Sequence, residues 1–234
     1  NIGRSPAPFQ RIQGAIVQLG IFATQSIQNF SGVLVFIGGS ENESPAVWAV
    51  SGASKEKLST TAIDNELSKL TDAEVENIYS WVYAEGGAYF YGFSTGSTTF
   101  VYDSVNQRWH ERQSLVRNEL IRYRVSHIIT AYGRPLVGDI VDGRIGELDE
   151  DLYNEFGVLV RRFITKRPFD NNGDPVFVGM IEAVCESGVG LTDDVELENG
   201  ETSSGEPIMV TSGKDPQITL AWSDDGSRTF KGWL

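Results

Sequence analysis

Two aspartates and a group of arginines are the residues whose types and spacing come closest to a catalytic site. Hydrolysis of a glycosidic bond requires two carboxyl groups about 5–10 Å apart, and Asp139 and Asp142 form the best pair on a rigid predicted element. Arg117, Arg122 and Arg124 could bind the carboxylate of an acidic substrate. Both aspartates lie at hairpin ends, however, where Asp is common for conformational reasons, and 32 acidic residues produce many such pairs by chance. We therefore predict solvated arginines, no catalytic residue and no enzyme activity.

Few residues could bind a metal or act as a nucleophile. His110 and His127 have no third nitrogen or thiolate ligand at metal spacing, so both are predicted to be packed or surface histidines. Cys185 is the single cysteine, which excludes an internal disulfide framework and a cysteine-based zinc cluster. No partner base accompanies it, and it is predicted to be a small core residue. We predict no cofactor and no metal.

Two acidic segments have the composition of cation sites without their spacing. Asp170–Asp174 lacks the ligand order and the terminal glutamate of an EF-hand loop. Asp193, Asp194, Glu196 and Glu198 could bind a cation weakly, although a solvated acidic loop is the favoured interpretation.

The charge of the chain excludes several classes of partner. With 19 basic and 32 acidic residues among 234, the net charge is −13, which argues against a nucleic-acid clamp and against docking on an anionic membrane. No apolar run approaches the length of about 20 residues that spans a bilayer. The charge is uneven: residues 1–104 carry −5, residues 105–170 carry +1 and residues 171–234 carry −9. The near-neutral, arginine-rich centre suits contact with other proteins.

The spacing of apolar and turn residues predicts an all-β fold of mostly antiparallel meanders. The chain has 25 glycines and 11% aromatic residues, with turn residues spread along it, which is typical of many short strands. An Asp-Gly turn at Asp142 is one of the strongest hairpin signals. The strands predicted in three successive groups are Gly32–Gly38, Ala46–Val50, Ala88–Phe93, Thr98–Tyr102, Gln107–Arg112, Tyr123–Tyr132, Leu136–Val141 and Arg144–Leu148.

One segment, Thr61–Tyr83, is predicted to be a short helical insertion. Ile63, Leu67 and Leu70 recur with helical spacing. Thr71 and Glu74 then form a capping box at the start of a second short helix.

The chain is predicted to divide into propeller-like blades over residues 1–156 and a C-terminal β segment, sandwich-like or a further blade, over residues 157–234. In the second part we expect long strands at Val158–Thr165 and Val176–Glu186, a mobile polar loop at Leu191–Pro207, and a hairpin of Gln217–Trp222 with Arg228–Trp233. Because the last residues resemble a strand cut in mid-course, we expect the chain to be a piece of a longer protein.

Meanders of similar size in series predict blades of a partial β-propeller, with a sandwich as the main alternative.

Ser223–Phe230 resembles the Asp-box of sialidases and other propellers, with Ser227 in place of the second glycine. That motif implies a structural turn, in which the Asp side chain accepts hydrogen bonds from turn amides. Trp81, Trp109 and Trp222 are predicted to be core aromatics; exposed on one face, they would instead indicate a carbohydrate- or protein-binding module.

The order of the elements carries a more specific resemblance. A strand pair, an acid-capped helical insertion and an aromatic strand precede Thr99–Asp103 and Trp109; Leu136–Asp139 and Ile145–Asp149 then close a meander. In this order the chain resembles the packaged-DNA-stabilisation proteins of short-tailed podovirus phages, the tail hub or nozzle below the portal.

The resemblance implies a non-enzymatic virion protein, assembled in the host cytoplasm. Its copies would form a hexameric ring that retains packaged DNA and continues the ejection channel. The implied partners are the portal or adaptor, the tail needle or plug and the tailspikes, with DNA passing the lumen without specific binding and with no membrane. No site residue is carried over from the family. A propeller glycosidase-like enzyme and a carbohydrate- or protein-binding β module remain the alternatives.

Overall fold

A computed structural model describes residues 16–149, 152, 154–160, 162–165, 177–182, 184, 195–212, 218–225 and 228–232. The chain divides into two compact units. The first comprises Asn1–Val116 and Leu120–Leu152, and the second comprises Arg117–Glu119 and Tyr153–Leu234. Within the described ranges, no helix is both long and apolar enough to cross a membrane.

The first sheet is built around one apolar hairpin. Its strands are β1 (Gly20–Ile21), β2 (Gln28–Phe30), β3 (Val33–Gly39), β4 (Ala46–Ser51) and β5 (Ser54–Lys57), all antiparallel. The order is β1-β3-β4-β5, and β2 pairs with the other end of β3. The two predicted strands of this group are confirmed as β3 and β4. The short strands β1, β2 and β5 carry too few apolar residues to be found by pattern.

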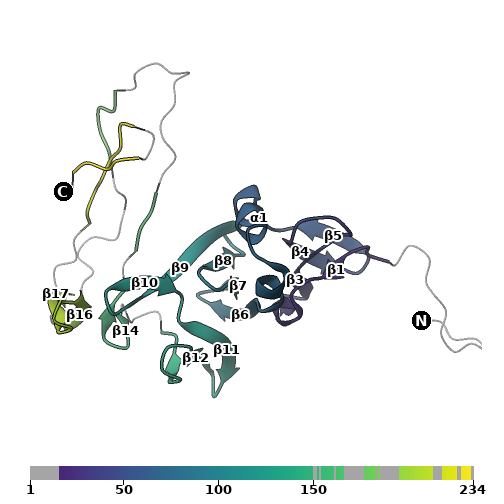
Figure 1. The fold of residues 1–234 in the computed structure, drawn as a ribbon, viewed down its shortest axis with the longest axis horizontal. Helices are drawn as coiled ribbons and strands as arrows, with labels where there is room; N and C mark the ends of the chain where they lie inside the picture. Colours follow the sequence, from purple (N-terminus) through teal and green to yellow (C-terminus); the bar gives the residue numbers. More distant parts are fainter. Residues whose placement is uncertain are drawn as a thin grey trace, which may run out of the picture. The chain divides into compact units, whose positions relative to one another are not determined.

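Two further antiparallel sheets follow along the chain (Figure 1). The second sheet has the order β10-β9-β8-β7-β6, and the third has the order β11-β12-β13. Their strands are β6 (Tyr79–Glu85), β7 (Ala88–Ser94), β8 (Thr99–Asp103), β9 (Arg108–Val116), β10 (Glu119–Arg122), β11 (Val125–Ala131), β12 (Arg134–Asp139) and β13 (Ile145–Glu147). The predicted meanders are confirmed here with ends shifted by a few residues.

The helical insertion is shorter than predicted. It consists of α1 (Thr61–Leu67) and α2 (Asp72–Glu76), and the predicted capping box of Thr71 with Glu74 is present. The prediction of helix up to Tyr83 is wrong, because β6 begins at Tyr79. The aromatic residues of β6 alternate with Ser80 and Val82, a period of two that a strand satisfies and a helix does not.

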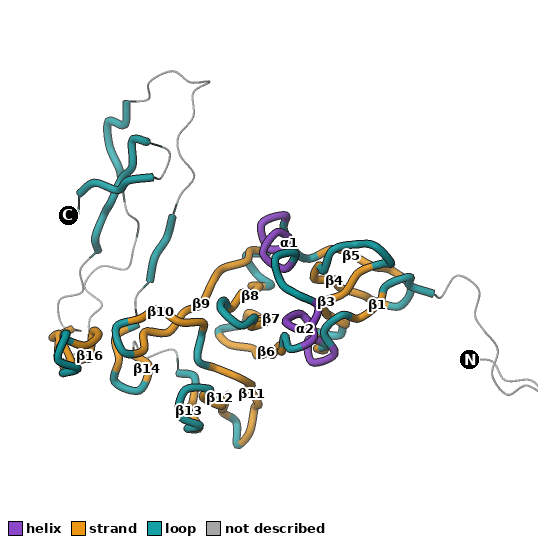
Figure 2. The backbone as a smooth tube through the Cα atoms, viewed as in Figure 1, coloured by secondary structure: helices purple, strands orange, loops and turns teal. Residues whose placement is uncertain are grey.

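The three sheets of the first unit form a stack in which the second sheet lies between the other two. Alternation along β7 explains this arrangement, since successive side chains of a strand point to opposite faces. Tyr91 and Phe93 pack with Val35, Ile37 and the buried faces of both helices, whereas Phe90 packs on the opposite side. Figure 2 shows the two helices beside the strands of the first and second sheets. Sheets stacked face to face in sequence order are the arrangement of propeller blades.

A tryptophan and a glycine interlock on the side of the second sheet that faces the third. Trp81 lies opposite Gly92 in the β6–β7 register. A Cβ atom on Gly92 would stand 2.2–2.5 Å from three atoms of the Trp81 ring, so this ring occupies the space that any larger residue would fill. Trp81 packs there with Tyr83, Val101, Tyr123 and others of the third-sheet side.

The second unit contains a four-stranded sheet in the order β14-β15-β16-β17. Its strands are β14 (Asn154–Glu155), β15 (Val158–Leu159), β16 (Val195–Glu201) and β17 (Pro207–Ser212). The prediction of a polar loop over Leu191–Pro207 is wrong for residues 195–201, because β16 pairs antiparallel with β17, whereas residues 202–206 form the turn between these strands. Val195 and Leu197 alternate with glutamates, and Leu197 is buried, which is the pattern of a strand with one apolar face.

The long strands predicted in the second unit are also wrong. β15 covers two residues, and the described residues 162–165 and 177–182 are not in strands. Apolar composition suggested these long strands, but only Val158–Leu159 pairs with described neighbours, β14 and β16. The predicted final hairpin is reduced, among the described residues, to a bridge between Trp222 and Lys231. The domain boundary predicted after Phe156 stays a prediction.

The predicted fold class is confirmed: the chain is mostly antiparallel β structure with two short helices. Within the described residues the sheets form no closed barrel.

Candidate functional site

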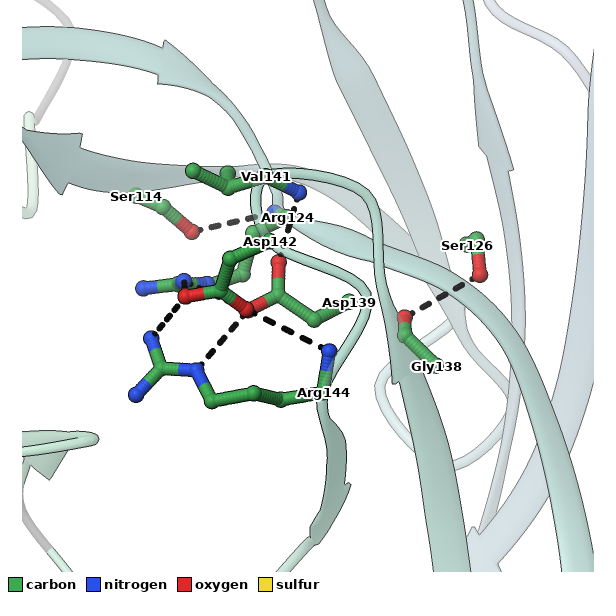
Figure 3. Close-up of polar contacts among 8 residues, drawn as sticks. All are labelled: Ser114, Arg124, Ser126, Gly138, Asp139, Val141, Asp142 and Arg144. Atoms are coloured by element: carbon green, nitrogen blue, oxygen red, sulfur yellow. Dashed lines mark hydrogen bonds and ion pairs between the residues drawn. The ribbon is translucent and has the colours of Figure 1, made fainter.

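The best predicted carboxylate pair, Asp139 and Asp142, is brought together with two arginines at the end of the third sheet (Figure 3). Asp139 ends β12, and its carboxylate accepts a hydrogen bond from the Arg124 guanidinium at 2.5 Å and from the Val141 amide at 2.8 Å. The side chains of Asp139 and Arg124 are only 1% and 6% exposed. This is a buried ion pair.

Asp142 and Arg144 form the outer half of the same cluster. The Arg144 guanidinium lies 2.6 Å from Asp142 and 3.8 Å from Asp139, and the Arg124 guanidinium lies 3.6 Å from Asp142. Two backbone hydrogen bonds fix the frame: the Asp139 amide donates to the Arg144 carbonyl, and the Ile140 amide donates to the Arg124 carbonyl. The turn between β12 and β13 therefore holds two acidic and two basic side chains in a closed network.

The Arg124 backbone ties this cluster to the second sheet. Its amide donates to the buried hydroxyl of Ser114 in β9 at 3.1 Å. The prediction that Arg124 is solvated is wrong, because its side chain is buried. A buried guanidinium requires a charged partner, and the Asp139 carboxylate supplies it. The sequence shows that Arg124 and Asp139 carry opposite charges, but not that they are neighbours. They become neighbours only because β11 pairs with β12.

The chemistry of the cluster is that of a structural clamp. A general acid must hold a proton that it can give to a substrate, but Asp139 is buried and already accepts from Arg124 and Val141. Asp142 is more exposed, but like any surface carboxyl group it is ionised at neutral pH, and a side-chain hydrogen bond from Arg144 lowers its pKa further, to about 2, so it holds no proton to give. The two carboxylates neutralise arginines and join β12 to β13.

The lowered pKa of Asp142 predicts a pH dependence. Since its carboxyl group has an ordinary pKa of 3.8 and a pKa of about 2 in the fold, its contribution to stability is fully present above about pH 3.8. It is lost as the pH falls from 3.8 to about 2. We expect a carboxyl-carbon NMR titration to give the low midpoint, and Asp142→Asn to flatten the pH dependence of unfolding between these values. A midpoint near 3.8 would contradict the ion pair.

The other two predicted arginines do not join this cluster. The Arg122 guanidinium donates to the phenol oxygen of Tyr79 and, at 3.3 Å, to the Thr95 carbonyl. Arg117 is exposed in the turn after β9, with φ of 47°. Each arginine has its own surroundings, so the three do not form one anion site.

A fourth arginine, which sequence reasoning missed, is enclosed by aromatic rings. The Arg112 guanidinium carbon lies 5.5–6.0 Å from the ring centres of Trp81, Tyr83, Phe90 and Tyr123. It also donates to the Tyr83 phenol oxygen at 2.6 Å. Burial raises the pKa of that phenol, and the positive charge of Arg112 opposes the rise. The sequence predicted the aromatic alternation of β7 but not the strand β6, and nothing in β9 marked Arg112 as the cation among these rings.

The predicted metal and nucleophile candidates are placed as follows. His110 lies in β9 and accepts a hydrogen bond from Arg112 at 3.3 Å. His127 stacks on Tyr79 with ring centres 5.5 Å apart. In the described part of the chain no three His, Cys, Asp or Glu residues gather as a metal site. Glu196 and Glu198 lie in β16. Cys185, Asp170–Asp174, Asp193 and Asp194 are outside the described residues.

The surface of the first unit has two shallow hollows. One contains Glu66 and Glu111 without an arginine, and the other combines Glu56 with Lys57 and Arg108. Neither has the two facing carboxylates with an arginine group that a propeller glycosidase would need.

The segment that resembles an Asp-box is a structural turn, as predicted. The Asp225 carboxylate accepts hydrogen bonds from the Arg228 and Thr229 amides at 3.0 and 2.8 Å and from the hydroxyls of Ser223 and Thr229. These bonds, with the Thr229 hydroxyl first, hold the pKa of Asp225 well below its ordinary value.

The three tryptophans differ in burial. Trp81 is buried, and Trp109 is half-buried and donates to the Leu58 carbonyl at 2.9 Å, so both belong to the core. The prediction of a core position is wrong for Trp222, which is 44% exposed. Its ring lies against Gly232, whose Cβ position would be 2.0 Å from the ring. One exposed tryptophan, covered on this side, does not make the aromatic platform of a binding module.

Comparison with known proteins identifies the family. No curated protein matches the chain. A family model described as bacteriophage P22 Gp10, β-propeller, matches residues 1–153. The match includes the whole stack of three sheets and agrees with the predicted propeller-like fold. Because it covers more than half of the 234 residues, the chain belongs to this family of phage DNA-stabilisation proteins.

Proposed function

We propose that this chain is part of a structural protein of a short phage tail. Its copies form a hexameric ring below the portal or adaptor, and the ring retains the packaged genome and continues the channel through which DNA leaves. The tail needle or plug and the tailspikes are its further partners. The protein is assembled in the host cytoplasm and acts in the virion, without catalysing a reaction.

The observation that carries this proposal is the family match over residues 1–153. The local chemistry supports it, because the charged cluster most similar to a catalytic site is occupied by its own arginines. Stacked sheets joined by buried polar contacts, such as Arg124 with Asp139 and with Ser114, also suit a protein with a mechanical role.

The net charge of −13 supports a channel that DNA passes without adhering. An acidic channel wall repels the DNA phosphates, so the DNA is not held back by binding to lysines or arginines as it passes. The acids of the β16–β17 hairpin, including the exposed Glu196 and Glu206, are the first candidates for this wall. A tail map with these acids on the outer rim and a basic lumen would overturn this part of the proposal.

Deleting the gene from the phage tests the retention of DNA. We expect heads to be filled and then to lose their genome, so that nuclease-protected DNA per particle falls at least tenfold, while complementation with the full-length gene restores it. Particles that keep their DNA without the protein would contradict the proposal. Electron cryo-microscopy of the tail tests the location, since the protein should form a sixfold layer beneath the portal.

A further inference from the structure

Arg112 lies where the second sheet meets the segment that leads into the third sheet. The residue is half-buried, and its guanidinium carbon is 5.5–6.0 Å from the ring centres of Trp81, Tyr83, Phe90 and Tyr123. No described carboxylate forms an ion pair with it. We call these four rings the aromatic box. The cation inside the box is held by ring faces and by hydrogen bonds instead of by an opposite charge.

His110, two residues earlier in β9, supplies a hydrogen-bond acceptor that orients Arg112. Successive residues of a strand alternate, so His110 and Arg112 project from the same face of β9. The Arg112 Nε–H group donates to His110 Nε2 at 3.3 Å. Since a neutral imidazole accepts at only one of its nitrogens, the proton of His110 must lie on Nδ1. The contact therefore requires one tautomer and an uncharged ring.

The gain of a proton by His110 reverses this contact. An imidazolium ion donates at both nitrogens, so two N–H groups and two positive charges would face each other across 3.3 Å. The guanidinium would lose its Nε partner, and repulsion would favour a position farther from His110. We propose that His110 is an acid-sensitive switch, in which protonation displaces Arg112 from the aromatic box and loosens the packing of the second sheet on the third.

The charged and titratable groups around His110 favour its neutral form. Arg112 faces it from β9 and Asp103 faces it from β8, whereas Tyr83 of β6 and Tyr123, ahead of β11, contact Arg112. Burial first, and then the positive charge of Arg112, lower the pKa of His110 from its ordinary value of 6.5, and Asp103 opposes them.

The direction of this pKa change fixes how stability depends on pH. Because the folded protein binds the proton of His110 less tightly than the unfolded chain does, the stabilising contact is fully present above pH 6.5. It is lost as the pH falls from 6.5 through the lowered pKa of the folded state. Histidines are the side chains that ordinarily change charge between about pH 5 and 8, and the chain has only 2 of them.

Nitrogen NMR of the imidazole rings in the full chain tests the contact between His110 and Arg112. We expect His110 to be the Nδ1–H tautomer at about pH 7.5 and to titrate with a midpoint below 6.5. The variant His127→Gln identifies which signal belongs to His110. An Nε2–H tautomer, or a midpoint at or above 6.5, would overturn the proposal.

The variant His110→Gln tests whether the proton loosens the sheets. Glutamine keeps an oxygen acceptor for Arg112 but cannot gain a proton. In the wild type, the amides of β6 should exchange faster at about pH 5.5 than at about pH 7.5, after correction for the intrinsic effect of pH, and the denaturant midpoint should be lower. Both changes should disappear in His110→Gln and persist in His127→Gln, the matched control at the other histidine. An acid response that survives in His110→Gln would show that another group carries it, and the switch would be disproved.

Discussion

Asp139→Asn is expected to lower the free energy of unfolding by about 3 kcal/mol or more. The substitution keeps the size of the side chain but removes the charge that faces Arg124, and both side chains are almost completely buried. Breaking a buried ion pair on one side leaves an uncompensated charge, which typically costs about 3–5 kcal/mol. The Asp142 carboxylate, 3.6 Å from Arg124, keeps the loss near the lower limit. Denaturant unfolding followed by tryptophan fluorescence would measure it.

Two controls separate the buried pair from a general effect of charge. Glu66→Gln removes one member of the exposed pair with Lys69, and the stability should change by no more than about 0.5 kcal/mol. Arg124→Met combined with Asp139→Asn should cost less than the sum of the two single changes, because no buried charge is then left alone. Equal losses in Asp139→Asn and Glu66→Gln would show that the cluster is not a clamp.

Gly92→Ala is expected to destabilise the first unit by about 2–3 kcal/mol through overlap with a neighbouring ring. The added methyl group would lie 2.2–2.5 Å from three ring atoms of Trp81, which is buried and cannot move aside without disturbing the core. Overpacking of a core typically costs about 1–3 kcal/mol. The backbone at Gly92 has no positive φ, so the effect is steric. Thermal or denaturant unfolding would measure it.

Gly96→Ala is the matched control for this prediction. Its Cβ position has no atom within 4 Å, and its backbone also lacks a positive φ. Trp81→Phe should rescue Gly92→Ala in part, since the smaller ring leaves space for the methyl group. Trp81 Nε1 is buried without a hydrogen-bond partner, so this replacement also removes an unsatisfied donor. If Gly92→Ala and Gly96→Ala had the same stability, the interlock of Trp81 with Gly92 would be disproved.

Local signals in the sequence predicted the first unit well. Apolar alternation and turn residues located β3, β4, β7, β8, β9, β11 and β12, and the capping box at Thr71 is present. β6 was missed because Ile78 and Tyr79 also continue a helical spacing, and the aromatic residues after them pack with residues far along the chain, including Val101, Tyr123 and Val137. In the second unit, apolar composition alone overestimated the strands near residues 160 and 180.

The site was harder to predict than the fold because its residues meet only through tertiary pairing. Asp139 and Asp142 were found as hairpin residues, but their neutralisation depends on Arg124, fifteen residues earlier than Asp139 and across a strand pair. Arg112 is one of several arginines in an arginine-rich stretch, and only the folded positions of β6, β7 and Tyr123 distinguish it. The position of each arginine in the fold, and not its residue type, therefore decides whether its side chain is buried or exposed to solvent.

The position of the second sheet between two others governs how the first unit comes apart. β7 and β8 supply side chains to both cores, so neither outer sheet can detach without exposing one face of the same strands to water. We therefore expect the amides of β7 and β8 to exchange hydrogen most slowly, through opening of the whole unit, and those of the edge strands β5 and β13 to exchange faster. We expect a force applied at either outer sheet to be transmitted to the central one, so that the three sheets unfold together rather than one by one.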